Sequence, residues 1–141
     1  MGTIICGFSG VGKSSVHNNN IVDLDSSNYK KDDLWPYKYV DDIIYEALKN
    51  NKTVLCSCHE EVRRELTNRG ISFVIVAPYD DLCNEYSKRW LKRGDSAEFI
   101  KYMQKNWIDF HRSIKIDGAL NNACVIYLNS GEYISDVIKM E

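Results

Sequence analysis

The sequence predicts an α/β fold built on a parallel sheet, and three observations support this prediction. Five short apolar runs alternate with segments in which apolar residues recur at helical spacing. Apolar strands that alternate with helices indicate a parallel sheet covered on both faces. A glycine-rich loop pattern directly follows the first run. We expect the whole chain, residues 1–141, to form a single domain.

The expected elements alternate along the chain. Strands are predicted at residues 3–7, 21–25, 53–57, 71–77 and 123–128. Helices are predicted at residues 13–17, 36–49, 60–69, 80–92, 96–114 and 132–140.

Particular residues set the bounds of these helices. The three asparagines at 18–20 favour turns, so the first helix is expected to be very short. Pro36 suits the first turn of the next helix, and the apolar residues after it recur at helical spacing. Gly70 is expected to cap the helix before it, and residues 94–96 separate the next two helices.

Residues 7–14 match the phosphate-binding pattern G-x-x-x-x-G-K-[ST] in full. Its glycines let backbone N–H groups surround anionic oxygens without a Cβ in the way. Lys13 is expected at the β- and γ-phosphates, and the Ser14 hydroxyl is expected to ligate Mg²⁺. The pattern therefore predicts binding of ATP with Mg²⁺ rather than an accidental turn. The expected contacts are Gly7, Ser9, Gly10, Val11, Gly12, Lys13, Ser14 and Ser15.

Composition narrows the range of partners. A net charge of −2 argues against bulk electrostatic binding of nucleic acid, which requires an excess of basic residues. No apolar stretch approaches the ~20 residues of a membrane span. Met1 to Thr3 lead directly into the first strand without a signal peptide, which predicts a cytoplasmic protein. The five cysteines are expected to be reduced thiols rather than a zinc site.

Two carboxylates end the second predicted strand. Asp23 and Asp25 are two residues apart, so their side chains are expected on the same side of the strand, near the phosphate loop. One could hold Mg²⁺ through water, and we assign this role to Asp23. The other, Asp25, could accept a proton from an attacking hydroxyl or bind the substrate. The alternative is a solvated pair that caps the next turn together with Ser26.

Basic residues supply the other half of the expected site. Arg89 and Arg93 share one face of a helix within a predicted lid at about residues 80–100, where they could close over a transferring phosphate. The competing interpretation is a solvated basic face, because Glu85 can pair with Arg89.

A second pair of arginines opens the helix after the third strand. Arg63 or Arg64 could hold the phosphate of an acceptor, or both could pair with neighbouring glutamates. His59, at the end of the same strand, is a candidate substrate contact.

Taken together, the loop at 7–14, the carboxylates of Asp23 to Ser27 and the Arg89/Arg93 pair resemble the small P-loop nucleotide kinases. Among these kinases, the chain is similar to compact adenylate-kinase-like (deoxy)nucleoside monophosphate kinases of phages and some bacteria. Segments 22–28, 57–63 and 131–137 also resemble that group.

The resemblance implies a three-layer P-loop kinase fold with strand order 2-3-1-4-5, and phosphoryl transfer from ATP to a nucleoside monophosphate. It implies that Gly10, Gly12, Lys13 and Ser14 hold the donor and that Arg89 and Arg93 act on the transferred phosphoryl group. Asp25 would contact the acceptor or the metal, and Arg63 the acceptor's phosphate. Asp23, Ser26 and His59 complete the expected substrate side.

Some features depart from the group. The third strand ends in Cys56-Ser57-Cys58 and not in an acidic residue, so Mg²⁺ would depend on Ser14 and the strand-two carboxylates. Three other functions stay open at this stage: a kinase of small hydroxyl metabolites such as shikimate or gluconate, a polynucleotide 5′-kinase, and a non-catalytic nucleotide-binding protein.

Overall fold

The computed structural model describes residues 2–16, 18–120 and 123–138. Five strands form one parallel sheet in the order β2-β3-β1-β4-β5. The strands are β1 (Ile4–Gly7), β2 (Ile21–Leu24), β3 (Thr53–Ser57), β4 (Phe73–Pro78) and β5 (Ala123–Leu128). The predicted fold class and strand order are confirmed.

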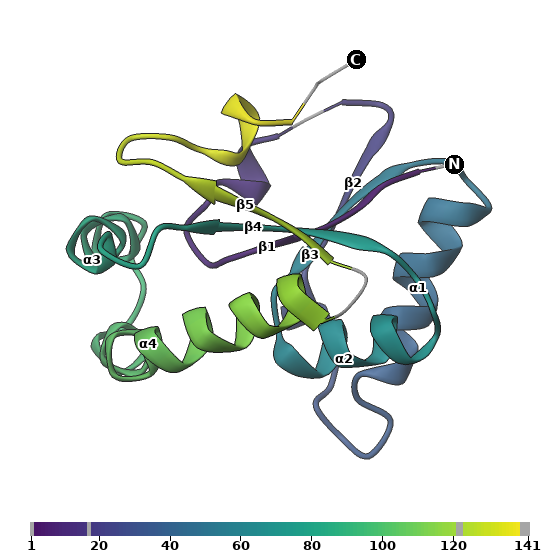
Figure 1. The fold of residues 1–141 in the computed structure, drawn as a ribbon, viewed down its shortest axis with the longest axis horizontal. Coiled ribbons are helices and arrows are strands. Elements are labelled where there is room, and N and C mark those ends of the chain that lie inside the picture. The colour runs from purple at the N-terminus through teal and green to yellow at the C-terminus, as the bar shows by residue number, and fades with distance from the viewer. Residues whose placement is uncertain (1, 17, 121–122, 139–141) are drawn as a thin grey trace.

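Four α-helices connect the strands: α1 (Tyr37–Leu48), α2 (Glu60–Asn68), α3 (Cys83–Lys92) and α4 (Ala97–Leu120). Figure 1 shows α2 and α4 on one side of the sheet and α3 beyond the carboxyl end of β4. The other side carries two short 3-10 turns, Lys13–Ser15 and Ile134–Asp136. None of the helices in the described part of the chain is both long and apolar enough to cross a membrane.

The predicted helix at 132–140 is wrong in its described part. Residues 134–136 form a single 3-10 turn, and residues 139–140 lie outside the described ranges. The turn is closed locally, because the Asp136 carboxylate accepts a hydrogen bond from the Tyr133 N–H at 2.8 Å. This local bond satisfies a backbone donor without a continuing helix.

Three other helices differ from their expected bounds. The helix expected at 80–92 begins at Cys83. The short helix expected at 13–17 is a 3-10 turn of three residues, because the backbone is extended again at Val16, and His17 lies outside the described ranges. The helix expected at 96–114 continues to Leu120.

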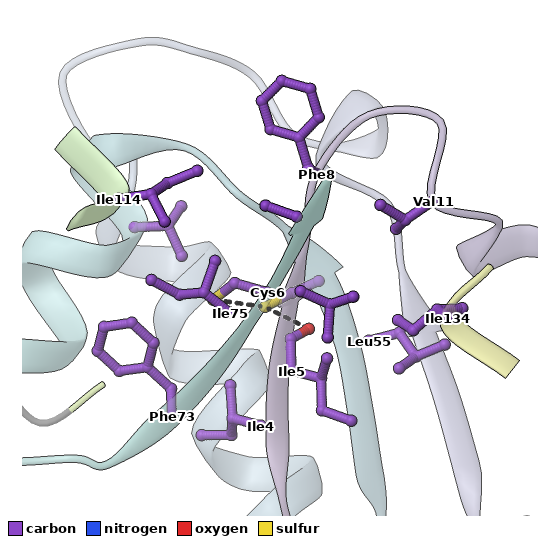
Figure 2. Close-up of a cluster of buried hydrophobic side chains, with 14 of the residues drawn as sticks. Ile4, Ile5, Cys6, Phe8, Val11, Leu55, Phe73, Ile75, Ile114 and Ile134 are labelled. Atoms are coloured by element: carbon purple, nitrogen blue, oxygen red, sulfur yellow. Dashed lines mark hydrogen bonds between the residues drawn. The ribbon is translucent and has the colours of Figure 1, made fainter. Parts of the chain in front are cut away.

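The core surrounds the central strand. All four residues of β1 are buried. Figure 2 shows Val11, Leu55 and Ile134 on one side of this strand and Phe73 and Ile75 on the other. β1 is thus fixed by packing on both faces, which places the loop that follows it at the middle of the sheet.

The cysteines are free thiols. The Sγ atoms of Cys6 and Cys56 lie 3.5 Å apart between neighbouring strands. Their hydrogen bond, together with burial, raises the pKa of Cys6. Burial raises the pKa of Cys58 to about 12. These thiols are therefore poor nucleophiles at neutral pH.

Candidate phosphate-binding site

The loop with the phosphate-binding pattern begins at the carboxyl end of β1. Gly10 and Gly12 have φ angles of 97° and 94°, in the left-handed region that favours glycine. A Cβ on Gly12 would stand 3.0 Å from Cδ1 of Tyr133. The Phe8 N–H donates to the Val76 carbonyl at 2.9 Å and ties the loop to β4. The backbone is therefore held in a conformation that suits an anion cradle.

Lys13 is the first residue of the 3-10 turn after this loop. Its Nζ donates to the Gly7 carbonyl at 2.8 Å, at the end of β1. Burial lowers the pKa of Lys13, and the charge of Arg93 adds to this effect, whereas the Asp23 carboxylate opposes it. The ammonium group is thus within electrostatic range of both the predicted lid and the predicted metal ligand.

Arg89 lies against the loop although 79 positions separate it from Gly10 in the sequence. Its guanidinium donates to the carbonyls of Gly10 at 2.9 Å and Glu132 at 2.8 Å. The same group lies over the rings of Tyr86 at 4.4 Å and Tyr133 at 3.9 Å. Cation–π contacts of this kind hold an arginine in one orientation.

Arg93 also reaches the loop from α3. Its guanidinium donates to the Ser9 hydroxyl at 2.8 Å and to the Asp95 carboxylate at 2.6 Å. The indole of Trp90, which is fully buried, donates to the Ser9 carbonyl at 3.2 Å. The part of the predicted lid that carries the arginines is therefore packed onto the loop in this structure.

Tyr86 and Tyr133 contribute to the site although sequence reasoning missed them. Tyr86 contacts Arg89 from α3, and Tyr133 lies close to Gly12. Tyr133 lies in segment 131–137, which resembles the kinase group, two residues after the turn at Gly131, which has φ of 80°. Contacts between segments so far apart in the sequence follow from the topology and leave no local pattern.

Glu85 joins the two segments that flank the loop. Its carboxylate accepts from the Gly131 N–H at 2.9 Å and from the Ser130 hydroxyl, and it pairs with Arg89 at 3.0 Å. The Gly131 hydrogen bond is the main cause of the lowered pKa of Glu85. The Glu85–Arg89 pair, which was the basis of the competing interpretation of a solvated basic face, is therefore present. Arg89 contacts the loop at the same time.

The two strand-two carboxylates are both exposed. Asp25 caps the 3-10 turn Ser26–Asn28, because its Oδ1 accepts from the Ser27 N–H at 2.9 Å. This bond is the main cause of the lowered pKa of Asp25, to which the charges of Lys13 and Lys31 also contribute. The structure thus contains the capping contact that was the alternative role of Asp25. Two cations also lie close enough to this carboxylate to affect its pKa.

Ser26 and His59 meet at the ends of β2 and β3. The Ser26 hydroxyl lies 3.0 Å from Nε2 of His59, and the Ser26 N–H donates to the Ser57 hydroxyl at 3.4 Å. Burial lowers the pKa of His59, and the nearby cations Lys31 and Lys13 act in the same direction. These residues, expected on the substrate side, are therefore brought together, with a neutral imidazole at neutral pH.

Arg63 is directed into the packing between α2 and α4. Its guanidinium pairs with Asp117 and donates to the Ser113 hydroxyl at 3.1 Å. The residue is 2% exposed, so a substrate phosphate could reach it only after a buried ion pair opened. Arg64 is exposed and pairs with Glu60 at 2.5 Å.

Cavities also open on the β4–β5 side of the sheet. One of about 350 Å³ lies between α4 and the ends of these strands, and one of about 600 Å³ adjoins Asn129 and Ser130. Residues 7–15 line neither of them.

Comparisons of the chain with protein-family models, with curated proteins and with solved structures find no match. The strand order, with helices flanking the sheet, is consistent with a P-loop-like α/β fold.

Proposed function

We propose that the chain transfers the γ-phosphoryl group of ATP to a (deoxy)nucleoside monophosphate. The convergence of three cations on one loop is the observation that carries this proposal. Lys13 lies in the loop, and Arg89 and Arg93 contact it from α3 at 2.9 and 2.8 Å. Cations around a loop with this backbone pattern suit a triphosphate and the charge that spreads over a phosphoryl group in transfer.

In the proposed reaction a phosphate oxygen of the acceptor attacks the γ-phosphorus of ATP. The bond from that phosphorus to the β–γ bridging oxygen breaks, and ADP leaves with the electron pair. Gly7 to Ser15 hold the donor, and Lys13 together with Arg89 and Arg93 neutralises the developing charge. Ser14 and Asp23 are both exposed near the loop and would hold Mg²⁺, which neutralises charge on the β- and γ-oxygens when bound.

The state of Asp25 favours a monophosphate acceptor. A hydroxyl acceptor needs a general base, whereas a monophosphate is already anionic. The hydrogen bond from the Ser27 N–H lowers the pKa of Asp25, which makes this carboxylate a weak base. Asp25 is therefore assigned to contact with the acceptor or the metal, and small hydroxyl metabolites are less suitable substrates.

A panel of acceptors tests the proposal. ADP release would be measured with ribo- and deoxynucleoside monophosphates, shikimate, gluconate and a 5′-hydroxyl oligonucleotide. We expect turnover with at least one monophosphate and none with the other acceptors. Turnover with another acceptor alone would contradict the assigned substrate, and ATP binding without any turnover would indicate a non-catalytic nucleotide-binding protein.

A further inference from the structure

We propose that Lys31 and Trp35 form an exchangeable pair that recognises the acceptor, with Lys31 binding its phosphate and Trp35 stacking on its base. This inference rests on the proposed function and specifies the acceptor as a ligand with both an anion and an aromatic ring. Both residues lie in segment 29–36, between the 3-10 turn Ser26–Asn28 and α1.

Trp35 is a supported aromatic surface. Its ring stacks on the fully buried Tyr39, with centroids 5.4 Å apart and an interplanar angle of 20°. The edge of its ring is fixed as well, because the indole N–H donates to Glu61 at 3.1 Å. His59 meets the ring edge-to-face at 5.6 Å. Trp35 nevertheless stays partly exposed, so the ring is held rigidly in place and remains accessible.

Lys31 covers this ring. Its Nζ lies 4.4 Å from the ring centroid and donates to the carbonyls of Ser26 and, at 3.2 Å, Tyr29. Across the described residues, the hydrogen bonds and the ring contact of Lys31 are with neutral groups, in contrast to the ion pairs of Arg63 and Arg64. A cation held by neutral groups is more readily available to an incoming phosphate than one held by a carboxylate.

Lys31 lies beside the residues that are expected to bind the acceptor. The Ser26 carbonyl that it binds belongs to the residue whose hydroxyl contacts His59. The charge of Lys31 acts on Asp25 and on His59, and so does that of Lys13 from the phosphate loop. The two ammonium groups therefore flank the ends of β2 and β3, where ligands bind in open parallel sheets.

Exchange follows from these contacts. When Lys31 leaves the ring for a phosphate, the exposed part of the Trp35 face becomes available to a base, and stacking replaces the cation–π contact. A small metabolite without an aromatic ring cannot make the second contact. The pair thus selects a nucleoside monophosphate by two groups at once.

Binding measurements that need no turnover test the pair. The probes are the 5′-monophosphates of the four common ribonucleosides and ribose 5-phosphate, titrated by calorimetry against the parent and against Lys31→Met and Trp35→Leu. We expect Lys31→Met to weaken both kinds of probe about tenfold. Trp35→Leu should weaken the best-bound monophosphate about tenfold and leave ribose 5-phosphate unchanged.

Matched variants separate binding from folding. Lys30→Met removes the neighbouring exposed lysine and should bind like the parent, and Trp35→Phe keeps an aromatic ring and should restore most of the affinity. Urea unfolding identifies any variant that fails to fold. In the parent, monophosphate binding should change the tryptophan emission, and Trp35→Phe should lose that change.

Each outcome decides between the two proposals. If the parent turns over a monophosphate and neither Lys31→Met nor Trp35→Leu changes the affinity for it, the proposed role of the Lys31–Trp35 pair is wrong. The proposed function would then still hold. Monophosphate binding that depends on both residues, in a parent protein without phosphoryl transfer, would support the pair and contradict the proposed function.

Discussion

The donor side and the acceptor side of the proposed site are held in different ways. On the donor side, Arg89 and Arg93 reach the loop from α3 through hydrogen bonds that span 79 and 84 positions of sequence. On the acceptor side, Asp25 bonds two residues away, and Lys31 reaches carbonyls two and five residues away. The donor side is therefore preformed by tertiary contacts, whereas Asp25 and Lys31 on the acceptor side make local contacts that a substrate can exchange.

Arg63, expected on the acceptor side, is held by buried tertiary contacts, and its removal should have the largest effect. Arg63→Leu removes the buried guanidinium that pairs with Asp117 and donates to Ser113, so we expect a loss of about 3 kcal/mol in the free energy of unfolding. Urea denaturation measures this loss. The double variant Arg63→Leu/Asp117→Leu should recover much of the stability, with the KM for the monophosphate close to that of the parent. A raised KM in the refolded double variant would instead assign Arg63 to the acceptor.

Arg89→Ala tests the preformed donor side. The substitution removes a guanidinium that is expected to neutralise charge during transfer, so kcat should fall about 10²-fold. Lys88→Ala, an exposed neighbour on α3, is the control and should keep parental kinetics. Unchanged kcat in a folded Arg89→Ala protein would show that the arginine only packs against the loop.

Substitutions of Asp25 distinguish its capping role from a role in catalysis. Asparagine can also accept the hydrogen bond from the Ser27 N–H, so Asp25→Asn should preserve the turn and lower kcat less than tenfold with a monophosphate. Asp25→Ala should cost about 1 kcal/mol of stability by loss of the cap. The same ADP-release assay measures kcat. A severe loss of kcat in Asp25→Asn would indicate that Asp25 is a general base and would contradict the role assigned to it.

His59 should produce the smallest effect, seen in the pH dependence of stability. Burial lowers its pKa in the folded protein, so the unfolded chain binds more protons just below the ordinary value near 6.5. Its contribution to stability is complete above that pH and declines as the pH falls below it. Urea unfolding between pH 7 and pH 5 should show a shallower decline for His59→Gln than for the parent, and parallel curves would contradict the shift.

The same division between tertiary and local contacts explains what could be predicted from the sequence. The strand order was implied by the resemblance, and the apolar runs predicted β3 and β5 at their observed bounds. Arg89 and Arg93 were predicted near the loop because their spacing puts them on one helical face. Nothing in local sequence predicted that Tyr133 would approach Gly12, since only the folded sheet brings residues 129–133 back to the loop.

Arg63 and the last helix show where local patterns mislead. A basic residue at the start of α2 is compatible with both phosphate binding and an ion pair, and its partner Asp117 lies 54 positions away. The apolar spacing at 132–140 suggested a helix, yet the Tyr133–Asp136 bond closes a single turn. The spacing of apolar residues could predict neither the Arg63–Asp117 ion pair nor the Tyr133–Asp136 hydrogen bond.

The most direct test is calorimetric titration of ATP·Mg²⁺ into the parent and into Lys13→Ala, with Lys49→Ala as an exposed-lysine control. Loss of the ammonium group that lies 2.8 Å from the Gly7 carbonyl should weaken binding by about 10²-fold or more, while Lys49→Ala binds like the parent. Equal affinity of the parent and Lys13→Ala, together with equal rates of ADP release, would contradict the account.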